Sequence, residues 1–165
     1  MSGDVEQRVG LGIDFHRFAS GRPLILGGVR IPFDKGLLGH SDADVLLHAI
    51  SDALLGAASL GDIGLHFPDS DPHFKGADSA HLLQSVVEMI EANGWQVGNV
   101  DTVIIAEAPK LAPHVSAIRE RIAQLLKVSA DQVGVKATTR EQMGSLGRGE
   151  GMAAQCVAFI RRSLP

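Results

Sequence analysis

The chain has 165 residues, a net charge of −4 and one cysteine, Cys156. This length suits a single domain, and one cysteine excludes both an internal disulfide and a cysteine-rich structural zinc site. The net charge is negative and no block of Lys and Arg occurs, which argues against a surface that binds duplex nucleic acid. An aromatic content of 4% argues against a surface on which bases stack.

The N-terminal decapeptide MSGDVEQRVG lacks the apolar core of a secretory signal, and no apolar run is long enough to span a bilayer. We therefore expect a cytoplasmic protein with neither nucleic acid nor membrane as a partner. Residues 1–7 are polar and are expected to form a disordered tail.

The first third of the chain predicts strands. From Val9 to Phe18, apolar residues alternate with Gly, Asp and His, which is the period of a strand. Residues 24–26 and 29–31 flank Gly27-Gly28 and predict a short hairpin. Residues 33–40 are expected to form a loop.

A helix is predicted next, with Ser41 as its cap and Asp44 completing a capping-box-like pair. Apolar residues from 45 to 54 follow the helical period, and the helix is expected to end near Gly56. Residues 59–76 are rich in Gly, Pro and Asp. They predict a long functional loop, because structureless segments of this length are uncommon in compact domains.

The second half predicts a helix over 79–92, a strand over about 100–107, a helix starting near Pro113, and strands over 133–138 and 152–161. This order of elements predicts one α+β domain over residues 1–165, with helices packed on one face of a mixed sheet.

Asp14 and His16 lie two residues apart in the first predicted strand, so their side chains point to the same face. They are a plausible pair of metal ligands, although a solvated polar face explains this pair alone better. His48 lies inside the first helix, where a histidine is more often a core residue. However, Asp44, His48 and Asp52 are spaced four apart, and this face is too polar for a simple core stripe. If this helix faced the strand, His48 would join Asp14 and His16 in a three-ligand metal site with an open coordination position.

Four further segments carry chemistry-bearing residues. His40 and Ser41 precede a helix N-terminus, which favours an anion such as phosphate; capping explains Ser41 but not His40. The carboxylates Asp62, Asp69 and Asp71 suit a metal or sugar hydroxyls, and a merely solvated loop explains them equally well.

The stretch KATTREQMGSLGRGEG offers the hydroxyls of Thr138 and Thr139, and Glu141 could hold a second divalent ion. It contains neither a P-loop nor a G-x-G-x-x-G pattern, and a glycine-rich turn is the alternative. Lys110 could reach a phosphate, although a surface lysine is the better reading of that residue alone. Cys156 lies between apolar residues and is predicted to be an inert buried thiol.

Taken together, these segments resemble the 2-C-methyl-D-erythritol 2,4-cyclodiphosphate synthase family. The resemblance runs from about Arg8 to the end of the chain. It rests on GIDFHRF, GGV-R-IP, KGLLGHSDADVLLHAISDALLGA, LGDIG–HFPDSDP–FKGADS, GNVD–IIAEAPK, VKATT and GRGEG, in that order. It implies a homotrimer with active sites between subunits.

The resemblance also implies residue roles. Zinc would be held by Asp14, His16 and His48, and a magnesium or manganese ion by Glu141, while His40 and Thr139 would stabilise the transition state. Ser145 and Leu146 stand where many members have Phe-Thr, and Arg140 stands where Thr is common. The implied substrate-binding positions are Asp14, Phe15, His16, His40, Ser41, Asp62, Ile63, Gly64, Phe67, Pro68, Asp69, Ser70, Asp71, Ala106, Ala108, Pro109, Lys110, Leu111, Thr138, Thr139, Ser145 and Arg148; Arg148 and Glu150 would line the trimer axis.

The implied reaction converts 4-diphosphocytidyl-2-C-methyl-D-erythritol 2-phosphate, a cytidine diphosphate-linked substrate, to 2-C-methyl-D-erythritol 2,4-cyclodiphosphate with release of CMP. It belongs to non-mevalonate isoprenoid biosynthesis. Two alternatives remain open: a metal-dependent phosphohydrolase that uses the same ligands with water as nucleophile, and a non-catalytic trimer that binds a metal or an isoprenoid phosphate.

Overall fold

The structure, a computed structural model, describes residues 4–164. Its strands are β1 (Val5–Ser20), β2 (Leu24–Leu26), β3 (Val29–Ile31), β4 (Lys35–Leu37), β5 (Gln96–Ile105), β6 (Val133–Thr138) and β7 (Gly151–Ser163). Its helices are α1 (Val45–Ala57), α2 (Ile63–His66), α3 (Ser79–Ala92), α4 (Val115–Leu126) and α5 (Gly144–Gly147), with short 3-10 helices η1 (Pro72–Phe74), η2 (Ala112–His114) and η3 (Ala130–Gln132).

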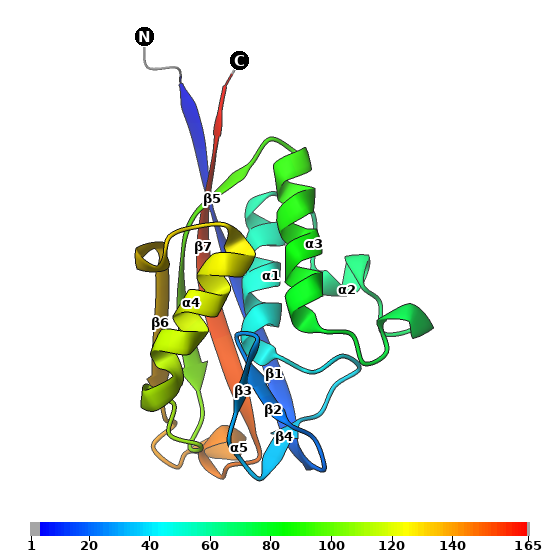
Figure 1. Cartoon of the computed structure of the whole chain (residues 1–165), viewed down its shortest axis with the longest axis vertical. Coiled ribbons are helices and arrows are strands. Elements are labelled where there is room, and N and C mark those ends of the chain that lie inside the picture. The colour runs from blue at the N-terminus through cyan, green and yellow to red at the C-terminus, as the bar shows by residue number, and fades with distance from the viewer. Residues whose placement is uncertain (1–3, 165) are drawn as a thin grey trace.

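Five strands form one sheet in the order β4-β1-β7-β5-β6, and β2 and β3 form a separate hairpin. Only β5 and β6 run parallel; the other neighbours in the large sheet are antiparallel. Helices α1, α3 and α4 lie on one face of this sheet (Figure 1). The predicted α+β architecture, with a mixed sheet and helices on one face, is confirmed.

Strand β1 turns its small and polar residues toward the helices and its apolar residues away from them. Val9, Leu11 and Phe15 are 68%, 60% and 58% exposed, whereas Gly10 and Gly12 face the backbone of α1. A Cβ atom added at either glycine would lie 1.9 Å from a carbonyl oxygen of that helix. The glycines therefore allow α1 to lie directly against the strand that carries Asp14 and His16.

The N-cap of α1 is Asp44, so the prediction of Ser41 as the cap was wrong. Asp44 has extended backbone angles, and its carboxylate accepts the backbone N–H groups of Leu46 and Leu47 at 3.2 and 3.1 Å. Ala43 has a φ of 59°, so the helical backbone cannot begin before this left-handed residue. The shift leaves Ser41 free for other contacts.

The prediction of a disordered tail was wrong for residues 5–7. These residues belong to β1 and pair with the end of β7, whereas residues 1–3 lie outside the described part of the chain. Glu6 bonds both Arg8 and Arg162 at 2.7 Å, and both guanidinium groups stack on the buried ring of Trp95. These partners are distant in sequence, which is why the polar composition alone suggested disorder.

Three other segments contain more structure than predicted. Residues 35–37, expected in a loop, form β4 against the end of β1. The expected loop over 59–76 contains α2 and η1, and the glycine-rich turn before β7 contains α5. Strand β5 spans 96–105 rather than 100–107. None of the helices in the described residues is long and apolar enough to cross a bilayer.

Candidate active site

The side chains of Asp14, His16 and His48 converge where β1 meets α1. The Oδ2 atom of Asp14 lies 2.9 Å from Nε2 of His16 and 3.0 Å from Nδ1 of His48, and these two nitrogens are 3.2 Å apart. Within residues 4–164, this is the group of His, Cys, Asp and Glu side chains placed to hold a metal ion. The structure thus joins the strand pair to the helical histidine, which spacing could not do.

The outer ring nitrogens of both histidines are held by partners, and these partners define the tautomers. Nδ1 of His16 donates to the carbonyl of Leu38 at 2.7 Å. Nε2 of His48 lies 2.9 Å from Oγ of Ser79, and that hydroxyl in turn donates to Asp42. Ser79 therefore accepts from His48, so when both imidazoles are neutral the nitrogens that face Asp14 carry lone pairs.

Sequence reasoning missed Asp42 and Ser79 as supports of this site. Ser79 is 31 residues from His48 and opens α3, where it reads as an ordinary N-terminal helix residue. Its backbone N–H also donates to Asp42 at 3.1 Å. No local sequence pattern predicts the contact between Ser79 and His48, because it depends on how α3 packs beside α1.

The contact between Asp14 and the two histidines shifts the pKa values of Asp14 and His16. Burial raises the pKa of the Asp14 carboxyl, but the hydrogen bonds and charges of His16 and His48 outweigh burial and hold that pKa well below its usual range. Burial lowers the pKa of His16, yet the hydrogen bond to Asp14 reverses this effect and leaves it raised. A carboxylate and two lone pairs that face one another attract a cation.

These residues fit a metal ion. A tetrahedral zinc with ligands at about 2.0–2.2 Å separates its ligand atoms by about 3.3–3.5 Å, so small outward movements of the three side chains would accommodate it. The ligand set of two imidazoles and one carboxylate is typical of catalytic zinc, which keeps its fourth position open. The partners of the outer ring nitrogens supply the orientation that metal-bound histidines require.

His40 and Ser41 lie in the loop between β4 and α1, next to this site. Nε2 of His40 is buried and, among the described residues, has no hydrogen-bond partner. Oγ of Ser41 accepts the backbone N–H of Ala43 at 3.1 Å and lies 3.2 Å from Nε2 of His48. Nε2 of His40 thus has an unused hydrogen-bonding capacity, whereas the Ser41 hydroxyl already supports His48.

Residues 7–161 match the YgbB family. The chain belongs to the YgbB family. A relative from Halalkalibacterium halodurans, named 2-C-methyl-D-erythritol 2,4-cyclodiphosphate synthase, is 62% identical over 153 residues, which are 93% of this chain and 98% of the relative. The resemblance seen in the sequence motifs is therefore confirmed.

Solved structures of YgbB-like proteins share the fold. The structure described as the bifunctional IspDF of Campylobacter jejuni superposes with a TM-score of 0.93 at 42% identity, and the match covers 96% of this chain and 43% of that one. A Plasmodium falciparum structure described as an IspF CDP complex gives a TM-score of 0.84 at 30% identity over 96% of this chain and 97% of its own.

In this YgbB-family chain, the Asp62–Gly64 segment is attached to α1. Asp62 caps α2 by accepting the N–H of Leu65 at 2.9 Å, and the N–H of Ile63 donates to Asp52 at 2.7 Å. Burial and the charges of Asp62 and Asp14 raise the pKa of Asp52, against the Ile63 hydrogen bond. Asp52, four residues after His48, therefore ties α2 to the helix that bears this histidine.

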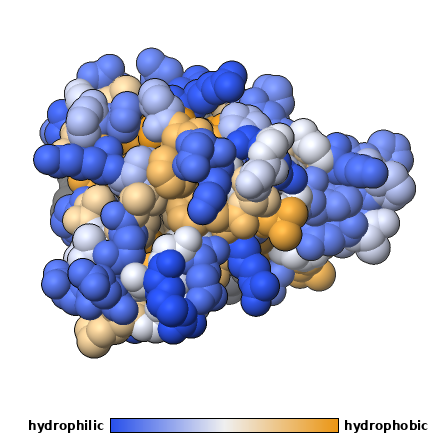
Figure 2. Space-filling model, turned by 90° about the horizontal axis from the view of Figure 1, so that it is seen from below, coloured by the Kyte–Doolittle hydropathy of each residue, from blue (hydrophilic) through white to orange (hydrophobic). Residues whose placement is uncertain are grey.

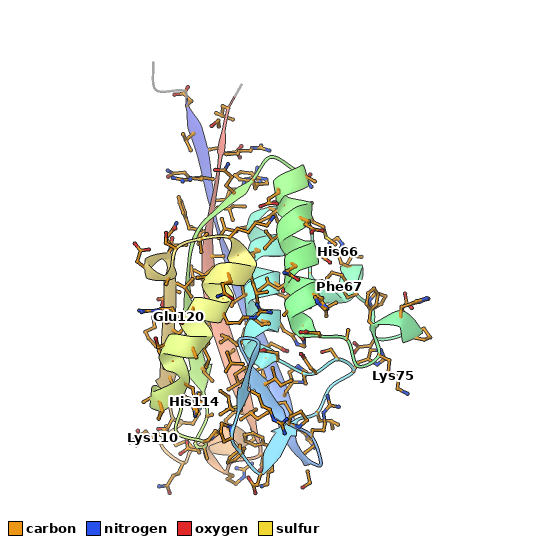
Figure 3. All side chains as sticks on the ribbon, viewed as in Figure 1. His66, Phe67, Lys75, Lys110, His114 and Glu120 are labelled. Atoms are coloured by element: carbon orange, nitrogen blue, oxygen red, sulfur yellow. The ribbon has the colours of Figure 1, made fainter. Side chains whose placement is uncertain are left out.

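The predicted nucleotide-binding residues other than Ala108 line one cavity of about 430 Å³. It is lined by the loop after β5 and by the end of β6: Ala106, Glu107, Pro109, Lys110, Leu111, Ala112, Ala137, Thr138 and Thr139. Figure 3 shows Lys110 at the foot of α4, whereas Phe67 lies across the molecule beside α2. Within one chain, the predicted nucleotide-binding loop and the Phe67–Asp71 segment are thus far apart.

Several other predicted residues lie between β6 and β7. The Thr139 hydroxyl donates to Glu141 at 3.1 Å, and Arg148 donates to Glu150 at 2.7 Å. A cavity of about 280 Å³ brings Ser145 and Glu150 together with His16. The end of the molecule that carries α5 and β4 bears a hydrophobic area bordered by hydrophilic side chains (Figure 2).

Proposed function

We propose that this chain converts 4-diphosphocytidyl-2-C-methyl-D-erythritol 2-phosphate to 2-C-methyl-D-erythritol 2,4-cyclodiphosphate and CMP, a step of non-mevalonate isoprenoid precursor biosynthesis. The observation that carries the proposal is the convergence of Asp14, His16 and His48 in a chain that is 62% identical to a protein named for this product. The 2-phosphate oxygen attacks the β-phosphorus, the bond between the β-phosphorus and the bridging oxygen breaks, and CMP leaves with that oxygen.

Zinc is the metal that we assign to Asp14, His16 and His48. When bound there, it would withdraw charge from the diphosphate. Glu141 is our candidate ligand for a magnesium or manganese ion that accompanies the substrate. A single carboxylate suffices for such an ion, because magnesium in phosphoryl-transfer sites is held largely by substrate phosphates and water.

The protein's own part is to position groups and to donate hydrogen bonds, since phosphoryl transfer needs little covalent help. The free Nε2 of His40 supports its role as a donor to phosphoryl oxygens in the transition state. Thr139, which lines the cavity that we assign to the nucleotide, is the second donor that we propose.

We propose separate sets of residues for the diol of the substrate and for its cytidine diphosphate part. We assign the diol to Asp62, Ile63 and Gly64, and its surroundings to residues 67–71, Phe15 and Ser41. The cytidine and its phosphates would occupy the 430 Å³ cavity, with Lys110 and Thr138 at the phosphates. Ser145 and Arg148 complete the proposed contacts.

A homotrimer would unite these groups, and two observations support it. The outer face of β1 exposes a row of large apolar side chains, and the two predicted halves of the substrate site lie far apart in one chain (Figure 3). Active sites between subunits would bring the halves together, with Arg148 and Glu150 at the trimer axis. The cytoplasmic location stays a prediction.

The test is incubation of the purified protein with substrate and Mg²⁺, followed by ³¹P NMR. We expect the paired resonances of a cyclic diphosphate together with CMP. A free 2-phosphate without a ring would indicate the phosphohydrolase, and unchanged substrate would indicate a binding protein. Either result would overturn the proposal.

A further inference from the structure

Arg22 lies in the turn between β1 and β2, and its side chain reaches the loop that precedes α1. Its Nη1 donates to the carbonyl of Gly39 at 3.1 Å, and its Nη2 donates to the carbonyl of Ser41 at 2.6 Å. These two carbonyls flank His40 on either side. The planar guanidinium can hold both at once, which a lysine cannot do in the same geometry.

The rest of this loop is equally well anchored through its backbone. The carbonyl of Leu38 accepts from His16, and the carbonyl of His40 accepts the N–H of Gly76 at 2.8 Å. The backbone around His40 is therefore fixed at four successive carbonyls. Its side chain is different, because Nε2 is buried without a partner among the described residues.

The anchored loop lies against the metal site itself. A Cβ atom added at Gly39 would lie 3.0 Å from Cε1 of His16, so the carbonyl that Arg22 holds belongs to a residue in contact with a metal ligand. A displacement of this loop would move His40 relative to His16. Misplacement of a catalytic group by about 1 Å costs on the order of 100-fold in rate.

We propose that Arg22 is a positioning residue, which fixes His40 beside the metal site by bonding the backbone carbonyls on both sides of it. Arg22 acts through His40 and does not itself contact the substrate. This inference rests on the proposed function for its kinetic readout, and its structural readout is independent of activity.

Arg30 is a matched control. It lies on β3, lines the same surface cavity as Arg22, is exposed and makes no side-chain hydrogen bond within residues 4–164. The comparison uses Arg22→Met, which keeps the apolar stem and removes the donors, Arg22→Lys, which can bond one carbonyl, and Arg30→Met, which removes the same charge nearby.

We expect Arg22→Met to lower kcat by about 10- to 100-fold with little change in KM, because an orienting contact is lost while substrate contacts remain. Arg22→Lys should recover part of this loss, and Arg30→Met should match the parent chain. Zinc content per chain should be equal in all four proteins. Equal kcat in the parent and Arg22→Met, or a fall in kcat that only parallels lost zinc, would overturn the proposal.

Histidine ring NMR separates this inference from the proposed function. If the parent chain forms no cyclic diphosphate, the proposed function fails, yet the His40 ring signals should still broaden or shift in Arg22→Met and not in Arg30→Met. Unchanged His40 signals would overturn the positioning role. If Arg22→Met does not fold, Arg22→Lys decides, and parent-like kcat and His40 signals in that variant would overturn the inference.

Discussion

At the scale of single residues, the candidate site depends on which atoms carry protons. Ser79 donates to Asp42 and so must accept from His48, while Leu38 accepts from His16. This arrangement turns one lone pair of each imidazole toward the carboxylate of Asp14. Three acceptors without a donor between them repel one another, unless a metal ion or a proton lies among them.

His48→Ala should abolish both zinc retention and CMP release, because two remaining ligands cannot hold the ion against dialysis. Zinc content by atomic absorption and CMP by chromatography measure the two effects. His81→Ala, which removes an exposed histidine on α3, is the control and should retain both. Full activity in His48→Ala would show that the ligand grouping is wrong.

Zinc affinity should weaken as the pH falls. Burial lowers the pKa of His16, but its hydrogen bond to Asp14 leaves that pKa raised above the ordinary 6.5. Protons therefore compete for its Nε2 more strongly than for an ordinary imidazole, and binding of the metal must release them. Titration with a chelating dye at about pH 8 and about pH 6 should show tighter binding at the higher pH; equal affinity at both would contradict this.

At the scale of elements, the distance between β1 and α1 decides whether the ligands meet. Gly10 and Gly12 face the carbonyl oxygens of Ala53 and Ala49, so the helix backbone lies against the strand without intervening side chains. Asp14 and His16 continue this same face of the strand. Because Gly10 and Gly12 have no side chains, α1 lies close enough to β1 for His48 to contact both Asp14 and His16.

Gly12→Ala should destabilise the fold by about 3 kcal/mol, because its methyl group would clash with the helix backbone and force the elements apart. Gly56→Ala adds the same methyl group within α1, where nothing lies within 4 Å, and should stabilise the fold by about 0.5–1 kcal/mol. Urea denaturation measures both. Equal effects of the two substitutions would show that the close approach does not matter.

At the scale of the whole molecule, the sheet has one face covered by helices and one face with an apolar row. Leu11, Ile13 and Phe15 of β1 are 60%, 49% and 58% exposed, and Val157 of the neighbouring strand is 43% exposed beside Leu11. Large contiguous apolar surfaces of this kind mark protein interfaces. Association through this face is what the proposed trimer needs.

Leu11→Asp should dissociate the trimer, because it buries a charge without a partner at the centre of the apolar row. Light scattering after size exclusion should give three times the chain mass for the parent and one chain mass for the variant, with CMP release lost. Gln84→Asp adds the same charge on the exposed side of α3 and should leave the mass unchanged. A trimeric Leu11→Asp protein would contradict this interface.

Local periodicity was enough to predict the helix at 79–92 and the strand at 133–138, which the structure reproduces. Local periodicity did not predict the structure of segments that are held by residues distant in the sequence. Residues 5–7 are ordered by Arg162 and by pairing with β7, and the start of α1 moves to Asp44, whose carboxylate also accepts from Gly27 and Gly28 of the hairpin.

The sequence by itself determined the class of fold, the motifs that identify the family and the pairing of Asp14 with His16 on one strand face. Only the tertiary structure decided that the glycine face of β1 is the buried one, that His48 joins the pair, and that Ser79 and Arg22 hold the residues around it. The physical reason is that strand and helix periods depend on neighbouring residues, whereas these contacts join segments that packing brings together across 17 to 34 residues of chain.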